Sequence, residues 1–348
     1  MNVRKIGMLA MVITVMSSCK KDNPIDDAGV VVPGDYENGY FVTNEGSFTD
    51  GIGSISFVTD EGIVENDVFA SVNSFPLGSV VQSMNIIGNN AYIVVNNSAK
   101  IEVASVADMK SVTTIDVVSP RYIAKVSAAK AYVTDWGING VQVIDLTTNT
   151  VSTTIACGAG TEGIAVSNGF AYVCNVGAWG LDSTVTIINT TTDAVVTTLT
   201  VGDKPNSAVV DANGAVWVLT GGYTEYDAAW NVVSETSGNL VKIVDNIIEA
   251  TFAFAVGNHP EDLVINDAGN TLFFSNGAVY AFDITATELS TTALINKSFY
   301  GLGCSNGYIY GTDAVDYVQS GWSFRYTENG SLVDSVQVGV IPGGYCFN

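Results

Sequence analysis

Seven short segments rich in aromatic and β-branched residues recur along the chain, and each ends in a small polar residue. They are spaced by about 40 residues, which is the length of one four-stranded unit of a β-propeller. The pattern therefore predicts an all-β fold, a seven-bladed β-propeller, in which each segment is the second strand of its blade. The segments are residues 40–44, 91–96, 131–135, 171–175, 215–220, 271–275 and 308–312.

One repeat shows the four strands of a blade most clearly. Residues 121–127, 131–135, 141–145 and 151–156 alternate apolar and polar side chains, as half-buried strands do, and we name these strands A to D. The A–B turns are short. Because an up-and-down blade places its A–B turn at one end, the B–C and D–A connections are expected at the other end.

The two ends of this repeat array predict how the ring closes. Residues 339–348 have the pattern of a turn followed by a strand A, whereas the first repeat begins at Tyr40 with a strand B. The C-terminal strand is therefore expected to join blade 1 and close the ring. Such closure leaves no open sheet edge at the seam.

The first 18 residues have the order of a signal peptide. Arg4 and Lys5 precede an apolar stretch at 6–15, and small residues precede Cys19. This order resembles a bacterial lipoprotein signal, which implies lipidation of Cys19; an ordinary secretory signal with an incidental Cys is the alternative. Residues 19–38 are then expected to be a flexible tether and residues 39–348 the propeller. The charged stretch after Cys19 resembles signals for the outer face of the outer membrane, which implies a lipid-anchored, surface-exposed protein.

Charge and composition argue against several kinds of partner. The chain has 13 basic and 35 acidic residues, a net charge of −22, and a surface this acidic repels nucleic acid and anionic lipid headgroups. Membrane contact is therefore expected only through the lipid anchor. With one His and no CxxC pair, we expect no metal site and no cofactor, and the four Cys after Cys19 are expected to be free thiols.

The B–C connections carry most of the unusual residues. They are long at residues 176–182, 221–238 and 313–322, and four of the five Trp fall in or beside such connections. Long loops on a rigid scaffold commonly carry function, and Trp and Tyr offer a large amphipathic contact area. The alternative is that these rings only pack against one another to hold the loops. We predict a ligand-binding surface formed by Phe48, Trp136, Trp179, Tyr223, Tyr226, Trp230, Tyr317 and Trp322.

Other polar residues reach the same face. The residues that end each strand B are expected to cap the strand by bonding nearby backbone, or else to border a central channel. His259 is expected to be a surface turn residue. No catalytic motif or metal motif is recognisable, so no catalytic residue is predicted and the protein is predicted not to be an enzyme. The strand-end residues are Asn44, Asn96, Asp135, Asn175, Thr220, Ser275 and Thr312; the carboxylates expected as rim charge are Glu45, Glu162, Glu261 and Asp262.

Four short motifs carry a family resemblance. Residues 202–205 and 257–260 have the turn pattern Gly-x-x-Pro, residues 132–135 read Tyr-Val-Thr-Asp, and residues 141–145 read Val-Gln-Val-Ile-Asp. These motifs resemble the YVTN-type repeat of YncE-like seven-bladed propellers, which are often labelled surface-layer proteins. The resemblance covers residues 39–348, and blades 1, 5 and 7 depart from it mainly by insertion.

The resemblance also implies a function. Lipoprotein propellers of this kind include the BtuG-type corrinoid binders, which sit on a TonB-dependent cobalamin importer. It therefore implies a cell-surface protein that captures a small amphipathic ligand, a corrinoid such as cobalamin, for a TonB-dependent outer-membrane transporter. A second hypothesis is an adhesin or glycan-binding propeller, in which Trp and Tyr stack on sugars. An enzyme such as a lactonase is the third hypothesis, and it ranks last because no catalytic set is recognisable.

Overall fold

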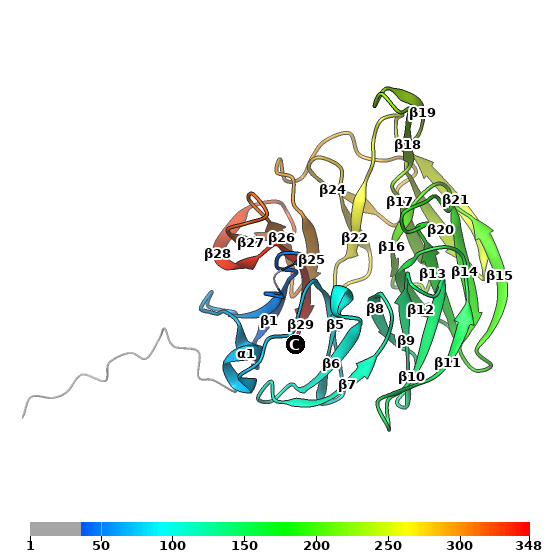
Figure 1. Cartoon of the computed structure of the whole chain (residues 1–348). Helices are drawn as coiled ribbons and strands as arrows, with labels where there is room; N and C mark the ends of the chain where they lie inside the picture. The colour runs from blue at the N-terminus through cyan, green and yellow to red at the C-terminus, as the bar shows by residue number, and fades with distance from the viewer. Residues whose placement is uncertain (1–35, 50) are drawn as a thin grey trace, which may run out of the picture. The chain divides into compact units, whose positions relative to one another are not determined.

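The computed structural model describes residues 36–49 and 51–348. The expected signal peptide, Cys19 and all but the last three residues of the expected tether lie outside these described residues. The described chain consists mostly of strands, which form seven small sheets arranged in a ring (Figure 1). This arrangement confirms the seven-bladed β-propeller. The seven segments recognised in the sequence are the second strands of the seven blades.

Blades 1 to 4 have four antiparallel strands each. Blade 1 contains β29 (Pro342–Phe347), β1 (Gly39–Asn44), β2 (Ser54–Thr59) and β3 (Val64–Glu65), and the short helix α1 (Val68–Asn73) follows it. Blade 2 contains β4 (Val81–Ile87), β5 (Asn90–Val95), β6 (Lys100–Ser105) and β7 (Ser111–Asp116), with the 3-10 turn η1 (Asn96–Ser98) between its second and third strands. Blade 3 contains β8 (Pro120–Lys125), β9 (Lys130–Asp135), β10 (Gly140–Asp145) and β11 (Thr150–Ala156). Blade 4 contains β12 (Thr161–Ser167), β13 (Phe170–Asn175), β14 (Thr184–Asn189) and β15 (Ala194–Thr200).

Blades 5 to 7 are more varied. Blade 5 contains β16 (Pro205–Val210), β17 (Val216–Thr220), β20 (Asn239–Val244) and β21 (Ile247–Ala253). Its long B–C connection folds into a hairpin of β18 (Tyr223–Tyr226) and β19 (Val232–Thr236). Blade 6 contains β22 (Glu261–Ile265), β23 (Thr271–Ser275) and β24 (Val279–Asp283). Blade 7 contains β25 (Gly301–Ser305), β26 (Tyr308–Asp313), β27 (Ser320–Thr327) and β28 (Leu332–Val340).

The ring closes as the chain ends predict. The C-terminal strand β29 pairs with β1 in an antiparallel register and becomes the inner strand of blade 1. Tyr345 and Phe347 of this strand pack against Tyr40 of blade 1 and Tyr310 of blade 7, with ring centroids 5.0–6.2 Å apart. Aromatic contacts of this kind contribute about 0.5–1.5 kcal/mol each beyond their burial. The closing strand therefore joins two blades as well as completing one.

The first strand of every blade lies at the centre of the ring. Taken in the order β29, β4, β8, β12, β16, β22 and β25, each inner strand contacts the next, and β25 contacts β29 again. The apolar side chains of the second strands are buried between neighbouring sheets, and Phe41, Trp217 and Phe273 are at most 1% exposed. The hydrophobic core thus lies between the blades, and residues of the inner strands face the central space.

Two parts of the fold differ from the sequence prediction. Blade 6 has no fourth strand: residues 285–293 form none, and only Ile295 bridges back to Val279. This segment is mostly Thr, Ser and Glu with Ala286, Leu289 and Ala293 at uneven spacing, so it lacks the regular alternation of apolar side chains that a strand would bury. Trp322 is expected from the sequence in a B–C loop but lies in β27, because the pairing of β27 with β26 continues as far as Asp313.

Tyr36 belongs to the packed part of the chain. It is 2% exposed, and its ring centroid lies 5.7 Å from that of Phe41 and 5.2 Å from that of Phe57. The side-chain amide of Asn348 donates to the Tyr36 carbonyl at 2.6 Å. Because β1 begins and β29 ends at this end of blade 1, the described chain enters the propeller on the side of the A–B turns.

Candidate functional site

The polar residues that end the second strands tie the backbone together. Asp135 accepts three backbone N–H bonds at 2.8–3.0 Å, from the preceding D–A turn and from its own B–C loop. Asn44 and Asn175 donate to hydroxyl groups near or on the neighbouring third strand. Thr220 accepts the N–H of Asn239 at 2.8 Å. Asp135 and Thr220 thus bond backbone, as the capping interpretation predicts, whereas Asn44 and Asn175 bond mainly to side-chain hydroxyl groups. None of the strand-end residues belongs to the lining of the central cavity.

A β-bulge interrupts six of the seven inner strands near their first residue. Only β25 pairs with its neighbour in continuous register. Bulges redirect side chains and are over-represented next to functional sites. We call the residues that the bulges leave out of the pairing with the second strand the bulge ring. They are Gln82 on β4, Arg121 and Tyr122 on β8, Glu162 and Gly163 on β12, Asn206 on β16, Asp262 on β22 and Gly343 on β29.

The bulge ring lines a cavity of about 780 Å³ at the centre of the propeller. One end of the cavity is bordered by B–C connections and D–A turns, which contribute Val176, Lys204, Tyr223 and His259. The mouth therefore opens on the face that carries the long connections, opposite the A–B turns. A volume of this size lies within the range of roughly 300–1,000 Å³ that is typical of small-molecule sites.

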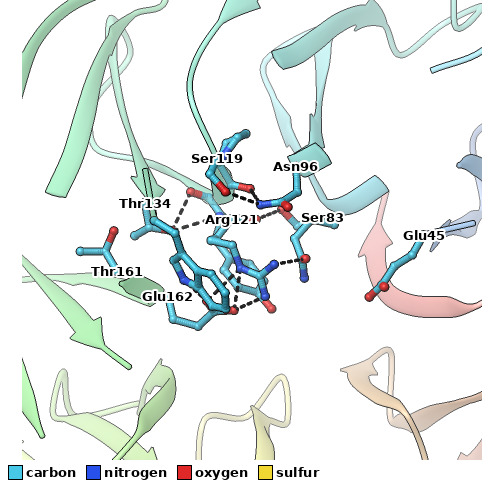
Figure 2. A network of polar contacts seen from close by, with 12 residues as sticks. Glu45, Ser83, Asn96, Ser119, Arg121, Thr134, Thr161 and Glu162 are labelled. Atoms are coloured by element: carbon cyan, nitrogen blue, oxygen red, sulfur yellow. Dashed lines mark hydrogen bonds and ion pairs between the residues drawn. The ribbon is translucent and has the colours of Figure 1, made fainter. Parts of the chain in front are cut away.

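Arg121 is the centre of a polar network that joins three blades (Figure 2). Its Nε lies 2.9 Å from Glu162 Oε2, its Nη2 lies 2.8 Å from Glu162 Oε1, and its Nη1 donates to the side-chain carbonyl of Gln82. Trp136 Nε1 donates to Glu162 Oε2 at 2.7 Å, and the guanidinium lies 4.4 Å from the centre of the Trp136 ring. Because the carboxylate binds the guanidinium at two points, the two charges neutralise each other within the structure.

On the opposite side of the cavity, Glu45, Glu261 and Asp262 form no ion pair within residues 36–49 and 51–348. Glu45 lies apart from the network in Figure 2 and accepts a hydrogen bond from the Tyr300 hydroxyl, which is 3.2 and 3.3 Å from its two oxygens. Burial raises the pKa of Glu45 and of Glu261. Burial, reinforced by the charges of Glu261 and Glu162, raises the pKa of Asp262 to about 7.

His259 joins the hairpin of blade 5 to the D–A turn of blade 6. Its Nδ1 lies 2.7 Å from the Gly221 carbonyl oxygen, which can only accept, so Nδ1 carries a proton. Its Nε2 lies 3.0 Å from the Thr224 hydroxyl and 3.2 Å from a Glu235 carboxylate oxygen. The turn position expected from the sequence is confirmed. The contacts with the hairpin add a role that the sequence did not indicate, which is to hold β18 and β19 beside the mouth.

Four of the eight aromatic residues predicted to bind a ligand lie at or next to the cavity. Tyr223 lines it. Trp136 covers Arg121, and Trp179, which is 93% exposed, meets Trp136 edge-on at 5.6 Å. Tyr317 contacts the lining residue Tyr300 at 5.7 Å between ring centroids. These rings form a partly exposed aromatic border beside a polar cavity.

The other four predicted aromatic residues are not part of the cavity lining. Tyr226 and Trp230 pair with each other at 6.0 Å on the blade 5 hairpin, and Trp230 is 82% exposed. Phe48 is exposed in the B–C connection of blade 1, and Trp322 is partly exposed on β27. The structure therefore separates a group beside the mouth from residues that lie elsewhere on the long connections.

Sequence reasoning missed much of the bulge ring. The carboxylates expected as rim charge line the cavity instead, and the cavity also contains side chains that were not singled out. A usable signal was present: in several inner strands a polar residue directly follows a Pro at or just before the start of the strand, which interrupts the apolar alternation. The missed lining residues of the inner strands include Gln82, Arg121, Tyr122, Asn206 and Ser207; Pro120, Pro205 and Pro260 precede polar residues in this way.

Membrane and metal features were sought in the part of the chain that the structure describes. There, no helix is long and apolar enough to cross a membrane, and no group of three or more His, Cys, Asp or Glu side chains is arranged to hold a metal ion. The four described cysteines are free, and burial raises the pKa of each thiol. They are Cys157, Cys174, Cys304 and Cys346.

Comparison with known families gives one match over most of the chain. The family described as "Domain of unknown function (DUF5074)" matches residues 38–336. The matched segment extends from just before β1 into β28 and so includes every inner strand except β29. No curated protein matches the chain.

Solved structures share the fold at low sequence identity. A functionally unknown protein from Desulfotomaculum acetoxidans DSM 771 has a TM-score of 0.64 at 15% identity, over 88% of this chain and 98% of that one. A putative 6-phosphogluconolactonase from Bacteroides uniformis ATCC 8492 has a TM-score of 0.65 at 11% identity, with the same coverage. Apo AztD from Citrobacter koseri has a TM-score of 0.54 at 8% identity, over 89% and 98% of the two chains. At these identities the likeness concerns the fold alone.

Proposed function

This chain belongs to the DUF5074 family, and from the geometry of its cavity we propose that it captures a corrinoid such as cobalamin at the mouth of the central channel. The protein is then a binding protein and not an enzyme. In this proposal the ligand is held by hydrogen bonds from the bulge ring and by contact with the aromatic residues beside the mouth.

The observation that carries the proposal is the presence of amide and carboxyl side chains at one level around the bulge ring. Gln82 and Asn206 present amide groups, Asp262 presents a carboxyl group, and the Arg121–Glu162 pair lies between the two amides in ring order. A corrinoid is a flat macrocycle with many amide side chains at its periphery. Each of these amides needs an acceptor for its N–H groups and a donor for its carbonyl. Arg121 and Glu162 bond to each other, and Asn206 donates to the Pro260 carbonyl and accepts from Ser207. The donors left for a ligand are therefore the remaining amide N–H groups of Gln82 and Asn206, and the acceptor is the Asp262 carboxyl group.

The border of the mouth suits the flat part of such a ligand. A corrinoid is too wide to sink fully into the channel, so its macrocycle would rest against rings at the mouth. Trp179 is almost fully exposed and makes an edge-on contact with Trp136. Lys204 Nζ lies 3.4 Å from the Ala178 carbonyl oxygen, which holds the Trp179 loop next to Tyr223. Trp and Tyr provide such contact at a low cost in conformational entropy.

The proposal also includes a place for the protein in the cell. We propose a lipid anchor at Cys19 in the outer membrane and a TonB-dependent transporter as the partner that receives the ligand. The direction in which the mouth opens supports an anchor at the N-terminal end of the chain. The described chain enters at Tyr36 on the side of the A–B turns, and the mouth opens on the opposite side. An anchor attached through Tyr36 would leave the mouth free to accept a ligand and to meet a partner.

A glycan-binding protein is the second candidate, and one observation favours it. A groove of about 530 Å³ lies beside the third strand of blade 6, where the fourth strand is missing. We call it the outer groove. Phe254, Phe274 and Tyr280 contribute aromatic rings to its walls, and Asn258 and Asn276 contribute amides. Aromatic faces with amide groups nearby are the kind of surface on which a neutral sugar stacks.

Calorimetric titration with cyanocobalamin tests the capture proposal. We expect saturable binding to the purified protein, and Trp179→Ala should weaken it by about 2 kcal/mol, close to thirtyfold, because a central exposed ring is lost from the contact. Asn213→Ala, in an exposed A–B turn, should leave the affinity unchanged. Trp230→Ala and Trp322→Ala should have smaller effects than Trp179→Ala. Absence of binding, or binding that Trp179→Ala leaves intact, would overturn the proposal; a glycan that binds instead would favour the second candidate.

A further inference from the structure

The two cations that line the cavity are already engaged. Arg121 is bonded to the carboxylate of Glu162 and to Gln82. Lys204 Nζ donates to backbone carbonyls of Ala178 and Gly180 in the blade 4 loop. Neither side chain is oriented to offer a free charge to a ligand at the centre of the cavity.

The carboxyl groups on the opposite wall are engaged much less. Four carboxyl groups line the cavity against these two cations, and one of the four is held by Arg121. Within residues 36–49 and 51–348, the side chains of Glu261 and Asp262 make no hydrogen bond and no ion pair, and Glu45 is bonded to the Tyr300 hydroxyl. The field inside the cavity on the side of blades 6 to 1 is therefore negative.

The backbone holds Asp262 in this position. Asp262 is left out of the pairing of β22 with β23, and its φ of 51° lies in the left-handed region that side chains other than Gly rarely adopt. Such a conformation costs free energy and persists where the surrounding structure imposes it, commonly at functional sites. The fold thus directs a carboxyl group without a partner into the cavity.

We propose that the wall formed by Glu45, Glu261 and Asp262 selects the ligand by charge, an inference that rests on the proposed capture function. It accepts an amine or another positively charged or N–H-rich group beside Asp262 and Glu261, and it disfavours carboxylates and phosphates. Opposite charges attract most strongly where water is partly excluded, and like charges are repelled there for the same reason. Phosphorylated sugars should therefore bind poorly, although a solved structure with this fold is named a putative 6-phosphogluconolactonase.

A charge series on one scaffold tests the inference. The probes are cyanocobalamin, a derivative with one peripheral amide hydrolysed to a carboxylate, and a derivative with one peripheral amide extended by an aminoethyl group. At pH 8 and constant ionic strength, calorimetry should show the amine derivative binding at least about tenfold more tightly than the carboxylate derivative, a difference of about 1.4 kcal/mol. Equal affinities, or tighter binding of the carboxylate, would overturn the inference.

Matched variants locate the effect. Asp262→Asn should reduce the ratio between the amine and carboxylate derivatives to less than about threefold, and Glu261→Gln should reduce it partly. Asp116→Asn removes one charge from the exposed outer strand β7 and should leave the ratio unchanged. If Asp116→Asn lowers the ratio as much as Asp262→Asn does, the preference comes from the net charge of the whole protein and the inference fails.

The pH dependence provides a second readout. The affinity for the amine derivative should rise about tenfold between pH 6 and pH 8 as the Asp262 carboxyl loses its proton. His259→Gln should keep most of the rise and Asp262→Asn should remove it. The titratable and charged groups that share the cavity with Asp262 are Glu45, Arg121, Tyr122, Glu162, Lys204, Tyr223, His259, Glu261, Tyr300 and Tyr345.

The failure of the capture function and the failure of charge selection give different results. If none of the three corrinoids binds, the capture function fails. The wall is then tested with spermidine against citrate at equal ionic strength, by the shift of the melting temperature. Spermidine should stabilise the wild type and Asp116→Asn, and it should stabilise Asp262→Asn less. No difference between these two variants would overturn the inference independently of any corrinoid.

Discussion

The two walls of the central cavity are built by the same backbone device and differ in what it presents. On the wall of blades 2 to 4, the bulges bring Gln82, Arg121 and Glu162 together, and these side chains bond to one another. On the wall of blades 6 to 1, the bulge presents Asp262, whose side chain makes no hydrogen bond or ion pair within the described part of the chain. The comparison teaches that a bulge fixes where a side chain points. The side chains on the adjacent inner strands decide whether it is bonded within the protein, as Arg121 is, or stays available to a ligand, as Asp262 does.

Removing a charged side chain should therefore lower the stability of the protein on the wall of blades 2 to 4 and raise it on the wall of blades 6 to 1. The first of these two effects should be the larger. Arg121→Met should lower the free energy of unfolding by about 3 kcal/mol, because it leaves the Glu162 carboxylate buried without its cation. Chemical denaturation measures this change. Arg325→Met is the matched control, since Arg325 pairs with Asp334 in the outer strands of blade 7, where the Asp334 side chain is 33% exposed. We expect a loss of about 1 kcal/mol there, and equal losses at the two sites would contradict the comparison.

On the second wall, Asp262→Asn should stabilise the protein. The folded-state pKa of Asp262 is about 7, well above the value of about 3.9 in an unfolded chain. The folded state therefore binds more protons between these values, and the wild type loses stability as the pH rises from 4 to 7. The variant lacks this loss, so above pH 7 it should be more stable by about 1–2 kcal/mol, and near pH 4 the two should be equal. Urea denaturation between pH 4 and 8 checks this. If the free energy of unfolding depended on pH in the same way for both proteins, ionisation of Asp262 would not destabilise the folded state.

Most of the fold was predictable because its signals are local. The run at residues 131–135 has its own strand pattern, and the strand at 342–347 could be assigned to blade 1 from the repeat phase alone. The missing strand of blade 6 was not predicted, because the repeat pattern implies a strand wherever the spacing allows one. Residues 285–293 have that spacing but lack the apolar alternation.

The site was predicted much less well, because it depends on pairing between distant segments. Arg121 and Glu162 are far apart in sequence and meet only because β8 and β12 are neighbours in the ring. A bulge is a mismatch in register between two strands, so neither strand reveals it alone. The aromatic residues were easier to recognise, yet only the structure separates Trp179, next to the mouth, from Trp230 on the hairpin.

A crystal structure of the protein grown with cyanocobalamin tests the central claim most directly, because it shows which surface holds the ligand. The account predicts one ligand at the mouth of the cavity, with its macrocycle beside Trp179 and with peripheral amides within hydrogen-bond distance of Asn206 and Asp262. A ligand in the outer groove, on the tip of the blade 5 hairpin or on the face of the A–B turns would contradict it.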